Sequence, residues 1–341
     1  MIVAPGGPAR GGSFGGAHTM SEFALIARHF RRPVADPAVR IGIGDDAAIV
    51  RAAPGCELAF SVDMLVEGRH FRADVDPAAL GHKVLAVNLS DLAAVGATPR
   101  WALLAGALPE ADDAWLGAFA RGLFALADRH GVTLIGGDTT RGPRNLCLTI
   151  IGELPAGTAL ARAGARGGDD VYVSGTLGDA ALALAGLERR IPMDAATLAT
   201  LRPRLERPEP RVALGLRLRG MASAAIDLSD GLTGDLQHIL DASGVGAQVE
   251  LARIPRSAPL DAELGGATRS VALACLLAGG DDYELCFTAP PAHRAALDVA
   301  AGDIGIVLTR IGVVTPEAGL HVRDEQGALL ADVPRAFDHF R

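Results

Sequence analysis

Aspartates next to glycines are the residues of this sequence most suited to chemistry. "GIGDD" contains Asp45 and Asp46, "LIGGD" ends in Asp138, and "AIDLSD" carries Asp227 and Asp230. Each follows an apolar run typical of a β-strand, so the carboxylates are expected where strands end. Adjacent like charges repel each other and have to be solvated or neutralised. A positively charged group is therefore expected near them.

Two further aspartates lie in apolar surroundings. Asp63 is part of the predicted strand "LAFSVDMLV" (58–66), and Asp91 lies in the apolar helix predicted over 77–97, one turn after Val87. A carboxylate on a buried helix face is costly unless it is paired. Any single aspartate in a loop is commonly a solvated turn or cap residue. Taken together, the set indicates carboxylates that converge around bound cations.

The donor atoms of this set favour a hard metal ion. Oxygen ligands suit Mg²⁺ before Ca²⁺ or Mn²⁺, and no His or Cys lies at zinc-ligand spacing. The calcium-loop pattern of Gly sixth and Glu twelfth is absent. Carboxylate-bound Mg²⁺ commonly serves phosphate chemistry, because it offsets charges that would repel in a low-dielectric cleft. The sequence therefore predicts several Mg²⁺ ions and a phosphate-transferring enzyme.

Lysine-based phosphate motifs are absent from the chain. There is no G-x-x-x-x-G-K-[ST], and Lys83 is the only lysine of the 341 residues, so a P-loop is excluded. The protein-kinase motifs H-R-D and D-F-G are missing as well. The stretches "GIGDD", "LIGGDTTRGP" and "LAGGDDYEL" let phosphates approach the backbone closely. Metal ions would then do the work that lysine does in those enzymes.

The composition indicates which binding partners and which cellular compartment to expect. The net charge is −8 and no basic block occurs, so neither nucleic acid nor an anionic membrane is an expected partner. No apolar run reaches membrane-spanning length. The four cysteines, at 56, 147, 275 and 286, form no C-x-x-C pair, which excludes a disulfide framework or structural zinc site. We expect a cytoplasmic protein.

The order of predicted elements indicates two α/β or α+β domains in tandem. Residues 1–20, rich in Gly, Pro and Ala, are expected to form a disordered tail. Helices and strands alternate from residue 21, and the composition turns to Gly, Ala and Arg around 155–170. We therefore predict a first domain over 21–154 and a second over 155–341.

Six motifs occur in the order and spacing of a known family. They are "GIGDDAA", "VDMLVEGRHF", "KVLAVNLSDLAAVGATP", "LIGGDTTRGP", "AIDLSDGLTGDL" and "GGDDYELCF", and with them the chain resembles thiamine-monophosphate kinases from about Ser21 to "FDHF" at 337–340. Aminoimidazole ribonucleotide synthetase, selenophosphate synthetase and a hydrogenase maturation factor belong to the same ATP-dependent superfamily. The resemblance implies that the first domain binds metal and ATP and forms a barrel across a homodimer.

The resemblance also implies roles for individual residues. Implied metal contacts are Asp46, Ser61, Val62, Asp63, Asp91, Asp138, Asp227 and Asp230, with Asp46, Asp91 and Asp138 the most critical. Implied ATP contacts are Gly137, Asp138, Arg162 and Ser229, and implied thiamine-phosphate contacts are His70, Asp281 and Phe337. Two positions depart from the family pattern. Val62 replaces a usual hydroxyl residue, so a metal contact there uses its carbonyl oxygen, and Asp281 replaces a common Glu.

Residue chemistry alone leaves the substrate contacts open. His70 after an apolar strand is more often a satisfied core or surface histidine than a ligand. Phe337 is as well explained by packing of the C-terminal segment. Arg162 is equally explained as a linker charge without function. An aromatic and an acid nevertheless suit a cationic thiazolium and an aminopyrimidine.

The activity implied is in-line transfer of the γ-phosphoryl group of ATP to thiamine monophosphate, the last step of thiamine diphosphate biosynthesis. No general base is needed, because the acceptor phosphate, with a second pKa of about 6, is already anionic. Selenophosphate synthesis would call for a Cys near the N-terminus and hydrogenase maturation for one at the C-terminus, but the first is Cys56 and the chain ends "DHFR". A non-catalytic cation- or nucleotide-binding protein is the alternative from a different class.

Overall fold

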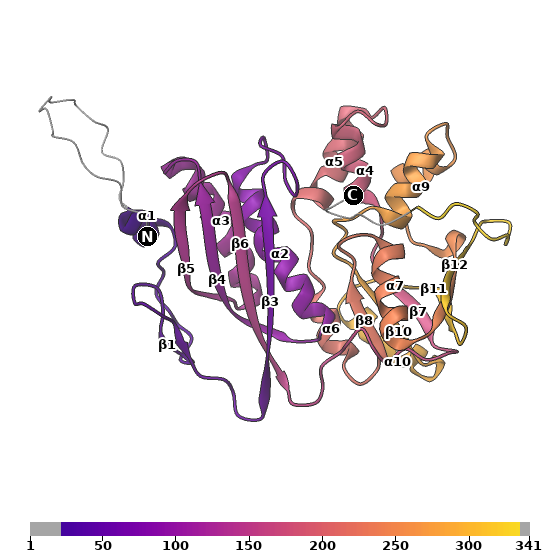
Figure 1. Ribbon diagram of the computed structural model, residues 1–341, viewed down its shortest axis with the longest axis horizontal. Helices are drawn as coiled ribbons and strands as arrows, with labels where there is room; N and C mark the ends of the chain where they lie inside the picture. The colour runs from indigo at the N-terminus through magenta and orange to yellow at the C-terminus, as the bar shows by residue number, and fades with distance from the viewer. Residues whose placement is uncertain (1–21, 335–341) are drawn as a thin grey trace, which may run out of the picture.

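The structure, a computed structural model, describes residues 22–334. The predicted tail, residues 1–20, and Phe337 lie outside the described residues. Two large β-sheets lie side by side, one in each half of the chain, with α2 and α6 between them (Figure 1). We refer to the chain up to β6 as the N-terminal half and to the rest as the C-terminal half.

The N-terminal half contains a four-stranded sheet in the order β3-β6-β4-β5. β4 and β5 are parallel, and the other neighbours are antiparallel. The elements are α1 (Glu22–His29), β1 (Val39–Ile41), β2 (Ile49–Val50), β3 (Cys56–Val66), α2 (Pro77–Ala94), β4 (Thr98–Leu108), α3 (Asp113–His130), β5 (Thr133–Arg141) and β6 (Asn145–Pro155). The sequence predicted Asp138 at the end of a strand. This prediction is wrong, because β5 continues past Asp138 to Arg141.

Local signals define the two long helices. Asp76 accepts the main-chain N–H of Ala79 at the start of α2, and Pro77 occupies the first turn, where its missing N–H costs nothing. Asp112 caps α3 in the same way, and α3 ends at Gly131, whose φ of 66° is readily adopted only by glycine.

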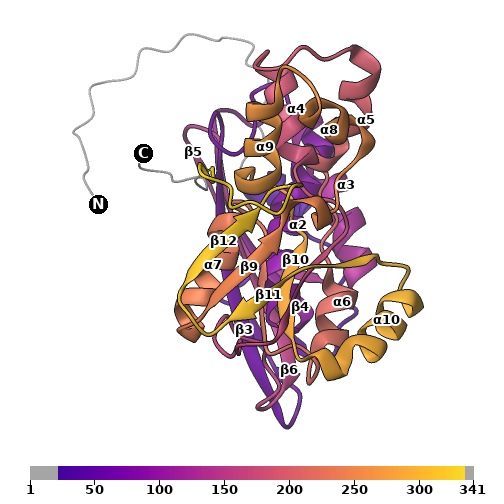
Figure 2. The ribbon, with the colours of Figure 1, turned by 90° about the vertical axis from the view of Figure 1, so that its right-hand side faces the viewer.

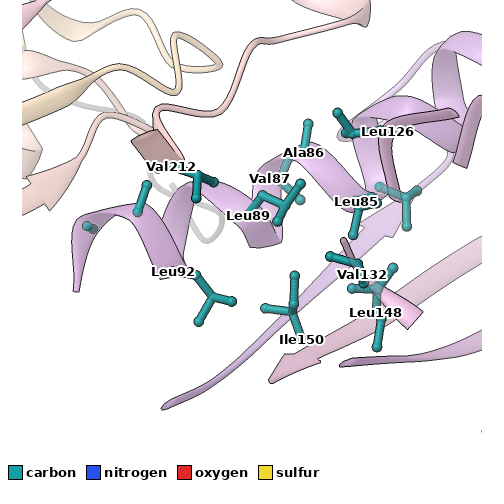
Figure 3. Packing of buried hydrophobic residues seen from close by; sticks show 14 of the residues in the cluster. Leu85, Ala86, Val87, Leu89, Leu92, Leu126, Val132, Leu148, Ile150 and Val212 are labelled. Atoms are coloured by element: carbon teal, nitrogen blue, oxygen red, sulfur yellow. The ribbon is translucent and has the colours of Figure 1, made fainter. Parts of the chain in front are cut away.

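α2 is buried on almost all sides, which explains why its sequence is apolar around the whole helix. Figure 3 shows its residues between Leu148 and Ile150 of the first sheet and Val212 of α6. Gly122 of α3 allows the two long helices to touch, because a Cβ there would lie 1.8 Å from the Ala78 carbonyl oxygen. α2 therefore belongs to the cores of both halves.

The other face of the first sheet is only partly covered. The β1–β2 hairpin packs on Trp101, Ile135 and Ile151 at the β4 and β5 side. Along β3 the outward side chains alternate with inward ones, and those of Leu58, Phe60, Val62 and Met64 are 38 to 64% exposed. Such a row of large apolar side chains is unusual on a monomer surface.

The C-terminal half contains a six-stranded mixed sheet in the order β12-β9-β11-β7-β10-β8. Its strands are β7 (Asp170–Ser174), β8 (Ala224–Asp227), β9 (Gly246–Glu250), β10 (Leu285–Ala289), β11 (Leu308–Thr315) and β12 (Gly319–Arg323). Its α-helices are α4 (Asp179–Leu187), α5 (Ala195–Glu206), α6 (Val212–Leu218), α7 (Leu232–Ser243), α8 (Ala258–Leu264), α9 (Arg269–Ala278) and α10 (Arg294–Asp303). Figure 2 shows α4, α5, α8 and α9 grouped at one end of this sheet, with α6 and α10 on one side and α7 on the other.

The packing gives the second sheet two different faces. One face contributes Val173, Ile226 and Cys286 to a core shared with α4, α7 and α9. The opposite face contributes Tyr172 and Phe287, whose rings stack at 5.2 Å, to the core that contains α2 and α6. No helix among residues 22–334 is both long and apolar enough to cross a bilayer.

Candidate active site

A cavity of about 570 Å³ lies between the two halves. Its walls come from β3 and α2 on one side and from β8, α4, α9 and the turn at 279–283 on the other. Seven of the residues singled out in the sequence line it: Asp63, His70, Asp91, Asp227, Ser229, Asp230 and Asp281. Residues separated by more than 200 positions in the chain therefore face one space.

The strand period explains how β3 presents its polar side chains. Ser61 and Asp63 share one face of the strand, toward α2, while Val62 points to the opposite, exposed face. The Ser61 hydroxyl donates a 2.5 Å hydrogen bond to Oδ2 of Asp91 on α2. Asp227 ends β8, as predicted, and Asp230 follows in the next loop. Three separate elements thus bring carboxylates to the cavity.

Crowding and burial perturb these acids. Burial raises the pKa of Asp63 to about 7, and the charges of Asp91 and Asp230 add to the shift. Burial also raises the pKa of Asp91, although the hydrogen bond from Ser61 and the charge of Arg162 act in the opposite direction. The pKa of Asp227 is well above its usual range because it is buried beside Asp91. Burial is the largest cause of all three shifts.

The oxygen-only donor set fits a hard cation such as Mg²⁺. Within the described part of the chain, however, no three Asp, Glu, His or Cys side chains lie close enough to hold one ion together. The carboxylates of this cavity are therefore neighbours, and residues 22–334 of one copy do not form a complete metal site.

A second cavity, of about 650 Å³, shares Asp91 and Asp227 with the first. Its walls are mostly apolar, with Phe60 of β3, Val95 and Leu160 among them, and Arg162 also lines it. Arg162 thus lies in the space adjoining the carboxylates and influences the charge of Asp91. The two cavities meet at the aspartates, which gives the site an apolar lobe and a polar lobe.

The expected substrate contacts His70 and Asp281 meet through a residue that the sequence analysis set aside. The Lys83 ammonium lies 2.9 Å from Oδ1 of Asp281 and donates a 3.3 Å hydrogen bond to the main-chain oxygen of His70. The His70 ring accepts the Val66 main-chain N–H at Nδ1, which fixes its orientation. The Tyr283 hydroxyl also donates to Oδ1 of Asp281, at 3.1 Å.

Asp46, Gly137 and Asp138 lie elsewhere. They line a third cavity, of about 960 Å³, between the loop at 42–48 and β5. β5 and β3 are opposite edges of the sheet, three strand spacings or about 14 Å apart. The structure therefore divides the predicted set into two groups. Arg31 lies near this loop, because its guanidinium would be 3.2 Å from a Cβ at Gly44.

The chain is similar to known proteins over most of its length. Residues 44–154 match the N-terminal domain, and residues 166–325 the C-terminal domain, of AIR synthase related protein. The thiamine-monophosphate kinase of Salmonella typhimurium is 50% identical over 323 residues, which are 94% of this chain and 98% of that protein. The chain belongs to the thiamine-monophosphate kinase family.

Solved structures of the thiamine-monophosphate kinase family share the fold. That of the Stenotrophomonas maltophilia enzyme superposes with a TM-score of 0.82 at 48% identity, covering 89% of this chain and 96% of that one. AaThiL, solved in complex with AMPPCP and TMP, superposes with a TM-score of 0.73 at 30% identity, covering 85% and 89%. The mixed α/β, two-domain architecture expected from the sequence is thereby confirmed.

Within this thiamine-monophosphate kinase family fold, two site features escaped sequence reasoning. Lys83 was noted only as evidence against a P-loop, yet its place as the sole lysine on an apolar helix was a usable signal. Asp235 accepts the main-chain N–H groups of Asp230 and Gly231. It thereby fixes the loop between β8 and α7, residues 228–231, which we call the aspartate loop. Packing also explains why a glycine occupies position 137, since a Cβ there would lie 1.9 Å from the Leu104 carbonyl oxygen.

Proposed function

We propose that this protein transfers the γ-phosphoryl group of ATP to the phosphate of thiamine monophosphate, giving thiamine diphosphate and ADP. One observation carries the proposal: aspartates dispersed over motifs from residue 63 to residue 230 line a single cavity between the halves. The test is to incubate the purified protein with ATP, Mg²⁺ and thiamine monophosphate and to measure thiamine diphosphate. Free thiamine serves as the control, and absence of the product would refute the proposal.

We propose that Asp63, Asp91, Asp227 and Asp230, with Ser61 and the Val62 carbonyl oxygen beside them, hold several Mg²⁺ ions. When bound, such ions offset the charge of the two phosphates and align the donor with the acceptor. Burial raises the pKa values of Asp63, Asp91 and Asp227, and this supports the role, because a bound cation would compensate charges that burial makes unfavourable. No general base is needed for an acceptor that is already anionic.

The two cavities suggest where each substrate binds. The apolar lobe with Leu160 and Arg162 suits a nucleotide, whose base packs on apolar side chains and whose phosphates reach toward Asp91 and Ser229. The polar lobe with His70 and Asp281 suits the acceptor, whose thiazolium is positively charged. We keep Phe337 as an expected acceptor contact outside the described residues.

We further propose a homodimer in which two four-stranded sheets close into one barrel. The exposed apolar row on β3, from Leu58 to Met64, would line that barrel. Two-fold closure of two such sheets can place the β5 edge of one copy beside the β3 edge of the other. Asp46 and Asp138 of the partner subunit would then join Asp63 and Asp91, and the divided set would become complete.

The remaining expectations from the sequence stay as proposals. We place the domain boundary between residues 154 and 155, which the two matched domain ranges support. We also place the protein in the cytoplasm, in keeping with its separated, unpaired cysteines.

A further inference from the structure

Lys83 is the only lysine of the chain, and it is only 3% exposed in the wall of the cavity between the halves. A buried ammonium is unfavourable unless a carboxylate compensates it. Asp281 does so at 2.9 Å, while the same ammonium donates to the main-chain oxygen of His70. Lys83, on α2, therefore connects one expected acceptor contact from each half of the molecule.

Asp281 lies in a turn that needs external support. Its φ is 69° and that of Tyr283 is 50°, which are left-handed conformations that residues other than glycine rarely adopt. The turn is tied to the aspartate loop by main-chain hydrogen bonds from Asp281 to Ser229 and from Tyr283 to Leu228. The Lys83–Asp281 ion pair ties the same turn to the N-terminal half.

The ion pair leaves the carboxylate available to a ligand. Lys83 and Tyr283 both contact Oδ1, and the Asp281 side chain remains 28% exposed toward the cavity that it lines. Because Lys83 is paired, its charge does not repel an entering cation as a lone ammonium would. The arrangement therefore holds an acidic group in a fixed position while one of its oxygens stays open to a ligand.

We propose that Lys83 is a positioning residue for the acceptor: it holds Asp281 beside the His70 segment so that the carboxylate meets the aminopyrimidine and thiazolium of thiamine monophosphate. The proposal rests on the proposed function for the identity of the acceptor. It assigns Lys83 no contact with the reacting atoms and no role toward ATP.

The kinetic test is a double-mutant cycle with Lys83→Met and Asp281→Asn. We expect Lys83→Met to raise the KM for thiamine monophosphate about tenfold, with the KM for ATP and kcat within about twofold of wild type. The double variant should be no worse than Asp281→Asn alone, because the two residues act as one unit. Multiplying effects, or an unchanged KM in Lys83→Met, would overturn the proposal.

Arg207→Met is the matched control. Arg207 forms an ion pair of 3.2 Å with Asp76 that also joins the two halves, but both side chains are largely exposed and neither lines the cavity. We expect its KM values to equal those of wild type. A rise in KM like that of Lys83→Met would mean that any broken contact between the halves has the same effect, and would contradict a specific role for Lys83.

A spectroscopic readout is available because a single lysine gives a single signal. Protein labelled with [¹³Cε]-lysine should show one resonance, which Asp281→Asn shifts without ligand and which thiamine monophosphate shifts in the wild type. A resonance that ignores both changes would refute the ion pair, even if Lys83→Met fails to fold. Should the wild type bind thiamine monophosphate without forming thiamine diphosphate, the proposed function falls, and the binding constants of the same variants decide the role of Lys83.

Discussion

Asp63 and Asp138 lie on opposite edge strands of one four-stranded sheet. If both belong to one catalytic centre, that centre has to combine residues of two subunits. Activity would then depend on dimer formation, so an activity assay can test the oligomeric state.

Mixed dimers test this division directly. Subunits with Asp46→Asn and subunits with Asp91→Asn should each be inactive, but their random mixture should regain about a quarter of wild-type activity. Half of the dimers are then mixed, and each has one intact site of two. A mixture of Asp63→Asn and Asp91→Asn subunits should stay inactive, because both residues come from the same edge. Rescue in this second mixture would contradict the arrangement.

The single Asp91→Asn substitution should abolish turnover without unfolding the chain. Removing one carboxylate ligand is expected to lower kcat at least about hundredfold. Circular dichroism and thermal unfolding should match wild type, since Asn is nearly isosteric and loses a buried charge. Asp241→Asn on the exposed side of α7 is the control and should leave the rate unchanged.

Mg²⁺ binding should release protons near neutral pH. With its pKa raised to about 7, Asp63 is about half protonated at pH 7 and has to lose that proton to bind a cation. The apparent affinity for Mg²⁺ should therefore fall as the pH drops below 7. Calorimetric titrations in buffers of different ionisation enthalpy count the protons, and Asp63→Asn should reduce the count. Proton uptake on binding would show that this assignment is wrong.

Placing a charge on the exposed face of β3 should disrupt the dimer. Phe60, at 64% exposure, is central in the apolar row, so Phe60→Asp should yield monomers in light scattering and lose activity. Val299→Asp, equally exposed on α10, should leave mass and activity unchanged. A wild-type protein that is monomeric and fully active would exclude the barrel.

Glu284 should matter for stability. It is fully buried and accepts hydrogen bonds from Ser174, Arg204 and Arg211. Glu284→Gln would leave two guanidinium groups without their carboxylate, and we expect a loss of about 3 to 5 kcal/mol in the free energy of unfolding. Glu250→Gln, which breaks the exposed pair with Arg253, should cost at most about 1 kcal/mol. Chemical denaturation measures both.

The sequence predicted the elements with strong periodicity and clear caps. β3 and α2 lie within a few residues of their expected bounds because strand alternation and an apolar helix that starts at Pro77 mark them. β4 was not predicted, although it is central in its sheet. Pro99 and its many small residues hide the strand pattern, and a bulge between Pro99 and Trp101 accommodates the proline.

The sequence predicted which residue types form the site better than it predicted how these residues are arranged. Asp63, Asp91, Asp227 and Asp230 do face one cavity. The separation of Asp46 and Asp138 from them could not be predicted, because the order of strands in a sheet is set by tertiary packing and leaves no local signal. Asp281 was in doubt for its short side chain, and its pairing with Lys83 depends on the same long-range packing.

α2 forms part of the cores of both halves, and this restricts how far the two halves can move relative to each other. Swinging the halves apart as rigid bodies would expose apolar surface along the whole length of that helix, at about 25 cal/mol for each Å². Exchange of reactants and products is therefore expected to rely on the surface loops around the cavity. α2 would keep the distance between the two walls of the cavity constant.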